Sequence, residues 1–216
     1  MSKVEIVLQR EGQDNKGVIS IRVKDREATV ADLLDAWQPL CDDQQVVKQY
    51  GDQLSGICKG CINNCCNTAY VIPDLIAFKK MAACLQLDHR RFIADYFDRE
   101  KVAAGLLRMR PDPCIFLKDN ICTVYPFRSL ICRFYLCSNM QGDCEQLIYS
   151  VAWAGSAALQ IFAEQNQLID PAPQAGLSSF DQMFKRLVEE YRYTPQVKHF
   201  LHAGDYSDIP LAPFLP

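Results

Sequence analysis

Eight cysteines gathered in two short segments constrain this chain more than any other feature of its sequence. Each segment contributes four of them: Cys58, Cys61, Cys65 and Cys66 in the first, and Cys114, Cys122, Cys132 and Cys137 in the second. A chain of 216 residues that is 49% hydrophobic can bury a full core without disulfides. The cysteines are therefore surplus to stability, and their density indicates metal binding or redox chemistry.

The start of the chain predicts a reducing compartment for these thiols. The stretch "MSKVEIVLQREGQDNKG" contains no apolar run of signal-peptide length and carries charge within its first few residues. We therefore expect a cytoplasmic protein, in which thiols stay reduced and dense cysteine patterns favour metal or redox sites over disulfides. The most apolar run, residues 147–163, is too short and too polar for a membrane span, so it predicts a buried helix and no membrane partner.

Charge narrows the choice of partner further. A net charge of −3 and a pI near 5.6 argue against nucleic-acid binding, which relies on many cations facing phosphates. The expected partner is a protein or a small molecule that the sequence does not identify. Residues 90–133 nevertheless carry nine Lys or Arg against five Asp or Glu, which suits either an anionic centre or a solvated face. Arg128 and Arg133 are the cofactor-binding candidates, as donors to sulfur.

Hydrophobic periodicity predicts a mainly α protein of the α+β type, with a helical domain around a polycysteine metal centre and a small N-terminal β-hairpin. Residues 4–8 and 18–23 flank a turn rich in Gly, Asn and Asp, which predicts the hairpin. Helical patterns cover residues 29–37, 42–50, 73–87, 88–97, 144–168 and 178–193. We divide the chain into a hairpin appendage (1–28), a cysteine-cluster metal-binding domain (29–170), and a C-terminal helix with a Pro-rich tail that packs on the domain (171–216).

The spacing of the first segment predicts a turn followed by a helix. One continuous helix over residues 58–65 would separate its outer cysteines by roughly 10 Å along the axis, too far to share a small centre. The neighbouring glycines permit the tight turn that a C-x-x-C pair makes around a metal. A helix beginning near Cys61 would place Cys61 and Cys65 one turn apart on a common face. Cys66 would then be rotated by roughly 100° from Cys65.

The second segment predicts a small hairpin with a cysteine on each arm. The runs "IFL" and "ICTVY" flank the turn-forming "KDN", so that Cys114 and Cys122 lie on opposite arms. The other two cysteines follow in "CRFYLC". Together the two segments supply enough thiols for two tetrathiolate sites, or for one cluster with spare ligands.

These motifs resemble the CxxCxxCC, or YkgJ-like, family of cysteine-cluster proteins. The matching stretches "CKGCINNCC", "CIFLKDNICTVY" and "LICRFYLC" occur in the family's order and spacing, and with the helices between them they span residues 54–137. Family members usually have Arg-Pro after the tyrosine, whereas this chain has Ser129 in place of the proline. The resemblance implies a bacterial protein with a zinc- or iron-chelating centre. A related pattern in flagellin lysine N-methylase implies a protein-lysine methyltransferase-like enzyme as a more distant alternative.

Cysteine spacing also bears on which metal the centre holds. Structural zinc sites usually pair two short knuckles, whereas this chain has one C-x-x-C pair and then irregular gaps of seven, nine and four residues. Irregular thiolate ligands favour an iron–sulfur cluster, of the 4Fe-4S type, that serves redox chemistry, cluster delivery or a modification reaction. The alternative is a zinc-stabilised protein-interaction module without redox activity. Charge does not discriminate, because both thiolate centres carry a formal charge of about −2.

The remaining cysteines are interpreted as packing residues and the histidines as surface residues. Cys41 and Cys84 lie among helix-forming residues, where a buried cysteine commonly serves as a small apolar side chain. Cys144 opens the long helix, and His199 and His202 lie one helical turn apart without a partner cluster. The sequence contains no G-x-G-x-x-G, P-loop, H-E-x-x-H or G-x-S-x-G motif, and neither cysteine segment contains a histidine base.

Overall fold

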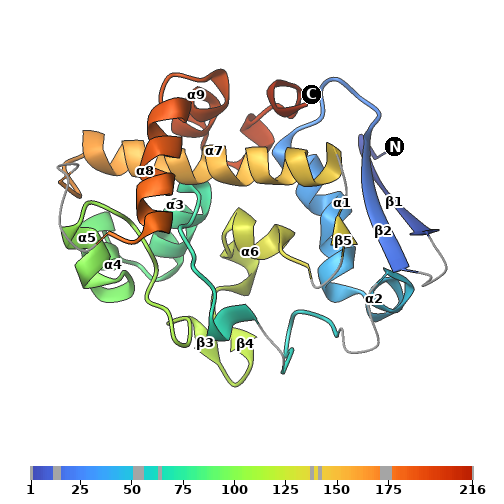
Figure 1. Ribbon diagram of the computed structural model, residues 1–216, viewed down its shortest axis with the longest axis horizontal. Helices are drawn as coiled ribbons and strands as arrows, with labels where there is room; N and C mark the ends of the chain where they lie inside the picture. The colour runs from blue at the N-terminus through green and yellow to red at the C-terminus, as the bar shows by residue number, and fades with distance from the viewer. Residues whose placement is uncertain are drawn as a thin grey trace.

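The computed structural model describes residues 2–11, 16–50, 56–62, 65–136, 139–140, 143–170 and 177–215. The fold is mainly α with a small β component, as predicted (Figure 1). The helices are α1 (Val30–Asp42), α2 (Gln44–Tyr50), α3 (Leu75–Cys84), α4 (His89–Tyr96), α5 (Arg99–Ala103), α6 (Leu130–Phe134), α7 (Asp143–Gln165), α8 (Ser179–Tyr191) and α9 (Pro195–His202). The strands are β1 (Val4–Glu11), β2 (Lys16–Val23), β3 (Leu117–Lys118), β4 (Ile121–Cys122) and β5 (Asn139–Met140). Short 3-10 helices are η1 (Cys65–Asn67), η2 (Tyr125–Phe127), η3 (Tyr206–Asp208) and η4 (Ala212–Phe214).

The predicted N-terminal hairpin is formed by β1 and β2. The two strands are antiparallel, with Val4 opposite Val23 and Ile6 opposite Ile21. β5 lies parallel to β2, so the sheet order is β1-β2-β5 and the chain that follows the second cysteine segment joins this sheet. Val4 and Ile19 are buried in the same hydrophobic core as the helices. The inner face of the hairpin therefore packs on the helical part, while the domain boundaries given above stay a prediction.

Capping residues determine where α1 begins. The Thr29 side chain accepts from the backbone N–H of Asp32, and the Asp32 carboxylate accepts from the backbone N–H of Thr29, which satisfies two N–H groups of the first turn. The helix predicted over residues 29–37 continues past Pro39, which lies inside α1, to Asp42. The short helix predicted next in the chain is α2.

The long helix α7 runs across the molecule and packs against α3, α6, α8, α9 and β2 (Figure 1). Val151, Ala154 and Leu159 are fully buried, which confirms the buried helix predicted for this run. Gly155 lets α3 and α7 approach closely, because a Cβ at this position would lie 2.6 Å from the Cβ of Asp74. No helix in the described part of the chain is both long and apolar enough to cross a membrane.

The C-terminal segment contains a further helix, α9, which was not predicted from its Pro-rich sequence. α9 begins at Pro195, where a missing backbone N–H is tolerated, and the Thr194 side chain caps it. Phe200 of α9 is fully buried, and the helix packs on α7. Beyond it, the N–H of Leu211 donates to Ala28 O at 2.7 Å. The tail therefore closes against the start of α1 as part of the core.

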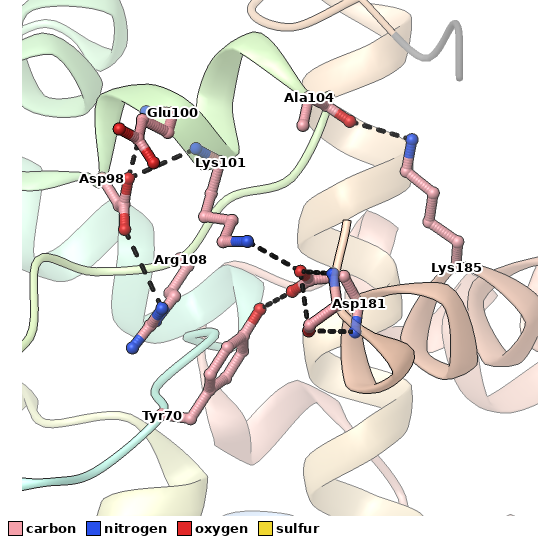
Figure 2. Close-up of polar contacts among 9 residues, drawn as sticks. Tyr70, Asp98, Glu100, Lys101, Ala104, Arg108, Asp181 and Lys185 are labelled. Carbon is pink, nitrogen blue, oxygen red and sulfur yellow. Dashed lines mark hydrogen bonds and ion pairs between the residues drawn. The ribbon is translucent and has the colours of Figure 1, made fainter. Parts of the chain in front are cut away.

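A buried carboxylate joins α8 to the segment that follows the first cysteines (Figure 2). Asp181 is fully buried and accepts from the Tyr70 hydroxyl, from Lys101 Nζ at 2.8 Å and from the backbone N–H of Ser178 at 2.7 Å. The guanidinium carbon of Arg108 lies 4.1 Å from the centroid of the Tyr70 ring. Because Tyr70 follows η1 by only three residues, this network anchors the end of the first cysteine segment.

Replacing Asp181 with asparagine should destabilise the protein by about 3 kcal/mol, because breaking a buried, hydrogen-bonded ion pair is costly. Burial would raise the pKa of Asp181, but its bonds to Lys101, Tyr70 and Ser178 outweigh burial and hold that pKa well below its usual value. The stability that this carboxylate contributes is therefore complete above its unfolded pKa of about 4 and is lost as the pH falls toward the folded value.

Urea unfolding of both proteins between pH 7 and pH 3 checks this prediction. The wild-type stability should fall more steeply below pH 4 than that of Asp181→Asn. Asp95→Asn is the matched control, because Asp95 forms an exposed pair with Arg91 in α4, and such pairs contribute under about 1 kcal/mol. Equal acid slopes in wild type and Asp181→Asn would contradict the prediction.

Candidate metal centre

The C-x-x-C pair of the first segment forms a tight turn, as predicted. The N–H of Cys61 donates to Cys58 O at 3.3 Å, and Gly60 adopts a φ of +86°, which favours glycine. The N–H of Cys58 donates to Cys41 O at 2.8 Å, which fixes the turn to the last residues of α1. The first pair therefore lies outside any helix and is held by backbone bonds.

The prediction of a helix that begins near Cys61 is wrong. Residues 61 and 62 are not helical, and a 3-10 helix of three residues begins at Cys65. The N–H groups of Thr68 and Ala69 both donate to Cys65 O, at 3.2 and 2.8 Å. This segment has no apolar periodicity that would bury one face of a longer helix, and short helices without such packing are marginal. Cys61 and Cys65 are therefore not placed by a shared helix face.

The hairpin predicted in the second segment is confirmed as β3 and β4. Leu117 pairs with Cys122, and the two turn residues Asp119 and Asn120 have φ values of +50° and +59°, typical of a tight two-residue hairpin turn. Cys122 lies on the second arm, whereas Cys114 lies just before the first, where its carbonyl accepts from the N–H of Leu117 at 2.8 Å.

Cys132, the third cysteine of the second segment, lies in α6, and a buried carboxylate fixes this short helix. The Asp74 side chain caps α3 through Ala77 N–H and also accepts from Leu130 N–H at 2.8 Å, in the first turn of α6. The hydroxyl of Tyr206 donates to the same carboxylate at 2.9 Å. Asp74 therefore holds α3, α6 and the C-terminal segment together, and so sets the position of Cys132.

Backbone hydrogen bonds bring the two cysteine segments together. The N–H of Cys114 donates to Cys66 O at 2.8 Å. The N–H of Gly60 donates to Asn120 O at 3.1 Å, which joins the C-x-x-C turn to the tip of the β3–β4 hairpin. Segments that are about fifty residues apart in the chain thus form one site.

Six of the predicted ligands interact electrostatically within this site: Cys58, Cys65, Cys66, Cys114, Cys122 and Cys132. All six are partly buried. Negative charge at Cys66 raises the pKa of, or otherwise acts on, each of the other five thiols. An electrostatic interaction also joins every pair among four of them: Cys66, Cys114, Cys122 and Cys132. Cys61 is partly buried in the turn, and Cys137 lies outside the described residues. No three Cys, His, Asp or Glu side chains of the described residues are arranged as ligands of a metal ion.

Burial and neighbouring thiolates set the protonation of these thiols. Burial raises the pKa of Cys122 to about 11, with a further contribution from Cys114 and Cys66. Burial likewise raises the pKa of Cys114. A hydrogen bond from Cys65 lowers the pKa of Cys66, so this central thiol is the more easily ionised member of its pair. Deprotonated thiols are the form that binds metal.

Arg128 is buried beside these thiols, with the Tyr125 side chain against its guanidinium. The residue is 6% exposed, and none of its three guanidinium nitrogens is hydrogen-bonded to a described residue. Its guanidinium carbon lies 3.7 Å from the centroid of the Tyr125 ring. Burial opposes its charge, but Tyr125 and the thiols of Cys41 and Cys58 hold the pKa of Arg128 above its usual value. A buried cation is costly unless an anion compensates it.

The second arginine candidate occupies a different position. Arg133 Nη2 donates to Gln38 Oε1 of α1 at 3.2 Å, and burial lowers the pKa of Arg133. Its role toward a cofactor stays a prediction, and its guanidinium is hydrogen-bonded to a side chain of α1.

Sequence reasoning missed the contribution of Cys41 to this site. Cys41 is 1% exposed, as expected of a packing cysteine, and its thiol donates to Arg133 O at 3.3 Å, but it also interacts with the Cys58 thiol and changes the pKa of that thiol. No spacing signal could have shown this, because the two residues are joined by the fold. Cys84, expected to be buried, is exposed at the end of α3, and Cys144 is buried at the start of α7.

Comparison with known proteins leaves the function to be argued from the site itself, since no protein-family model, curated protein or solved structure matches this chain.

Proposed function

We propose that this chain is an iron–sulfur protein that holds a cluster at the junction of its two cysteine segments. The single observation that carries an anionic thiolate centre here is the buried guanidinium of Arg128, which has no hydrogen-bond partner among the described residues and lies beside the gathered thiols. A charge in this position is costly unless an anion faces it. A thiolate-ligated centre, with a formal charge of about −2, supplies that anion. The choice of an iron–sulfur cluster over zinc rests on the irregular spacing of the cysteines.

The donor set fits a cluster. The four thiols that would hold it are Cys66, Cys114, Cys122 and Cys132, because an electrostatic interaction joins every pair among them. They come from a 3-10 helix, a residue before a strand, a strand and a short helix, so the ligands are scattered over loops as iron–sulfur ligands commonly are. A bound cluster would supply one-electron redox chemistry. Phe116, Val124 and Phe134 are buried around these cysteines and would limit access of water.

The proposal includes a reducing, cytoplasmic location, because free thiols and oxygen-sensitive clusters persist in reducing compartments. It also assigns Arg128 the role of balancing the charge of the centre. Arg128 would lower the cost of burying thiolates and would shift the reduction potential of the cluster, which depends on local charge and burial.

The experiment is anaerobic purification followed by metal and sulfide analysis and visible spectroscopy. We expect iron and acid-labile sulfide in equal amounts, with broad absorbance near about 400 nm that fades on reduction with dithionite. A colourless protein that retains zinc instead of iron would overturn the cluster and support a zinc-stabilised interaction module. A protein that takes up neither metal would overturn the whole proposal.

A further inference from the structure

We propose that Cys41 and Cys58 form a redox-active dithiol beside the candidate metal centre, which reacts with small hydroperoxides and closes to a disulfide. This site lies outside the four thiols proposed to hold the cluster, and it uses a cysteine of α1 that belongs to neither cysteine segment. The inference therefore goes beyond the proposed function and does not depend on it.

Backbone geometry already permits the disulfide. The N–H of Cys58 donates to the carbonyl oxygen of Cys41 at 2.8 Å. A carbonyl oxygen lies about 2.4 Å from its own Cα, and an amide nitrogen lies about 1.5 Å from its own Cα. The two Cα atoms can therefore be at most about 6.7 Å apart, which is within the range of about 4.4 to 6.8 Å found for disulfides.

The two thiols are also close enough for each to change the pKa of the other, and the Cys41 thiol donates to Arg133 O at 3.3 Å. The backbone on each side is held, because Cys41 lies inside α1 and the turn is closed by the bond from Cys61 N–H to Cys58 O. A disulfide can therefore form without a rearrangement of either element.

The difference in solvent exposure between the two cysteines indicates which of them reacts with the peroxide first. Cys58 is partly exposed, whereas Cys41 is 1% exposed, so a peroxide reaches Cys58 first. The Cys58 sulfur attacks one peroxide oxygen; an S–O bond forms, the O–O bond breaks, and the leaving hydroxide takes the thiol proton as water. The Cys41 sulfur then attacks the Cys58 sulfur; the S–S bond forms, the S–O bond breaks, and a second water leaves with the Cys41 proton. Two thiols lose two electrons, and hydrogen peroxide is reduced to two molecules of water.

Trypsin makes the test direct, because the two cysteines fall on separate peptides. Cleavage after Arg26, Lys48 and Lys59 gives residues 27–48, with Cys41 as its single cysteine, and residues 49–59, with Cys58 as its single cysteine. The full chain, as purified anaerobically and after chelation, receives one equivalent of hydrogen peroxide. It is then alkylated in denaturant, digested and analysed by mass spectrometry.

We expect the linked pair of peptides 27–48 and 49–59 to be the dominant disulfide, and a thiol reductant to abolish it. In Cys41→Ala, Cys58 should stop at the sulfenic acid, which dimedone traps. Cys144→Ala is the matched control, because it removes another buried cysteine, one that belongs to α7, and it should keep the linked peptides. A dominant disulfide elsewhere, or a Cys41 that stays fully alkylatable after Cys58 is oxidised, would overturn the inference.

Metal analysis of the same samples separates this inference from the proposed function. Iron content should be unchanged by formation of the Cys41–Cys58 disulfide in the purified protein, because neither sulfur is among the four proposed ligands. Loss of iron in step with the disulfide would overturn the claim that the dithiol is separate from the centre. Absence of iron from every sample would overturn the proposed function. The peptide map would still show whether Cys41 and Cys58 form the disulfide.

Discussion

Replacing Cys66 with serine is expected to strip the protein of its metal, with a loss of affinity of at least about 100-fold. Negative charge at Cys66 acts on each of the other five thiols in the site, so this sulfur lies at the centre of the donor set. A serine hydroxyl is a hard, weakly acidic ligand that binds soft metals poorly. Mutating even a residue that only hydrogen-bonds to a metal ligand lowers metal affinity by roughly 10- to 100-fold, so loss of a ligand itself should cost at least as much. The substitution does not remove the backbone hydrogen bond from Cys114 N–H to Cys66 O, so the two cysteine segments stay connected.

The measurement is the ratio of iron to protein in variants purified anaerobically side by side. Cys84→Ser is the matched control, because it makes the same change of sulfur to oxygen at an exposed position at the end of α3. The control should keep the wild-type ratio. A Cys66→Ser protein that retains its full complement of iron would show that the centre is assembled from other thiols.

Replacing Arg128 with methionine should have opposite effects on the metal-free and the metal-bound protein. Without metal, the substitution removes a buried cation that has no hydrogen-bond partner among the described residues, so stability should rise by about 1 to 4 kcal/mol. With metal, the thiolates lose the charge that balances them, so affinity should fall by about 10- to 100-fold. The contact of the guanidinium with Tyr125 reduces the gain in the metal-free state, because a cation–π contact is itself stabilising.

Urea unfolding of both forms, together with a competition assay for metal, checks this reversal of sign. Arg128→Lys should restore part of the affinity, because it keeps a positive charge. Arg133→Met serves as the control, because Arg133 already bonds to Gln38, and its loss should leave the metal-free protein no more stable than wild type. A loss of stability in metal-free Arg128→Met would mean that the guanidinium has a structural role instead.

Elements with strong local signals were predictable from the sequence. The helical pattern of residues 73–87 predicted α3, and the "KDN" turn predicted the β3–β4 hairpin, because periodicity and tight turns depend on residues that are close in the chain. The first cysteine segment was predicted in part: its turn was correct and its helix was wrong, since nothing in that stretch buries a helix face.

Features that depend on long-range contacts could not be predicted. The bond from Leu130 N–H to Asp74 joins residues 56 positions apart and fixes α6 from outside its own sequence. The contact between Cys41 and Cys58 likewise arises from the packing of α1 against the C-x-x-C turn. Arg128 was named as a candidate from its place among the cysteines, but only the fold shows that its guanidinium is buried and has no hydrogen-bond partner among the described residues.

X-ray absorption at the iron edge of the anaerobically purified protein tests most directly whether the two cysteine segments share one cluster. We expect a first shell of sulfur alone, with four sulfurs around each iron and neighbouring iron atoms in the next shell. The iron absorption signal itself should be lost or strongly reduced in Cys132→Ser, which alters the second segment, as well as in Cys66→Ser, which alters the first. A first shell of nitrogen or oxygen, or an iron site without iron neighbours, would contradict a thiolate-held cluster in this protein.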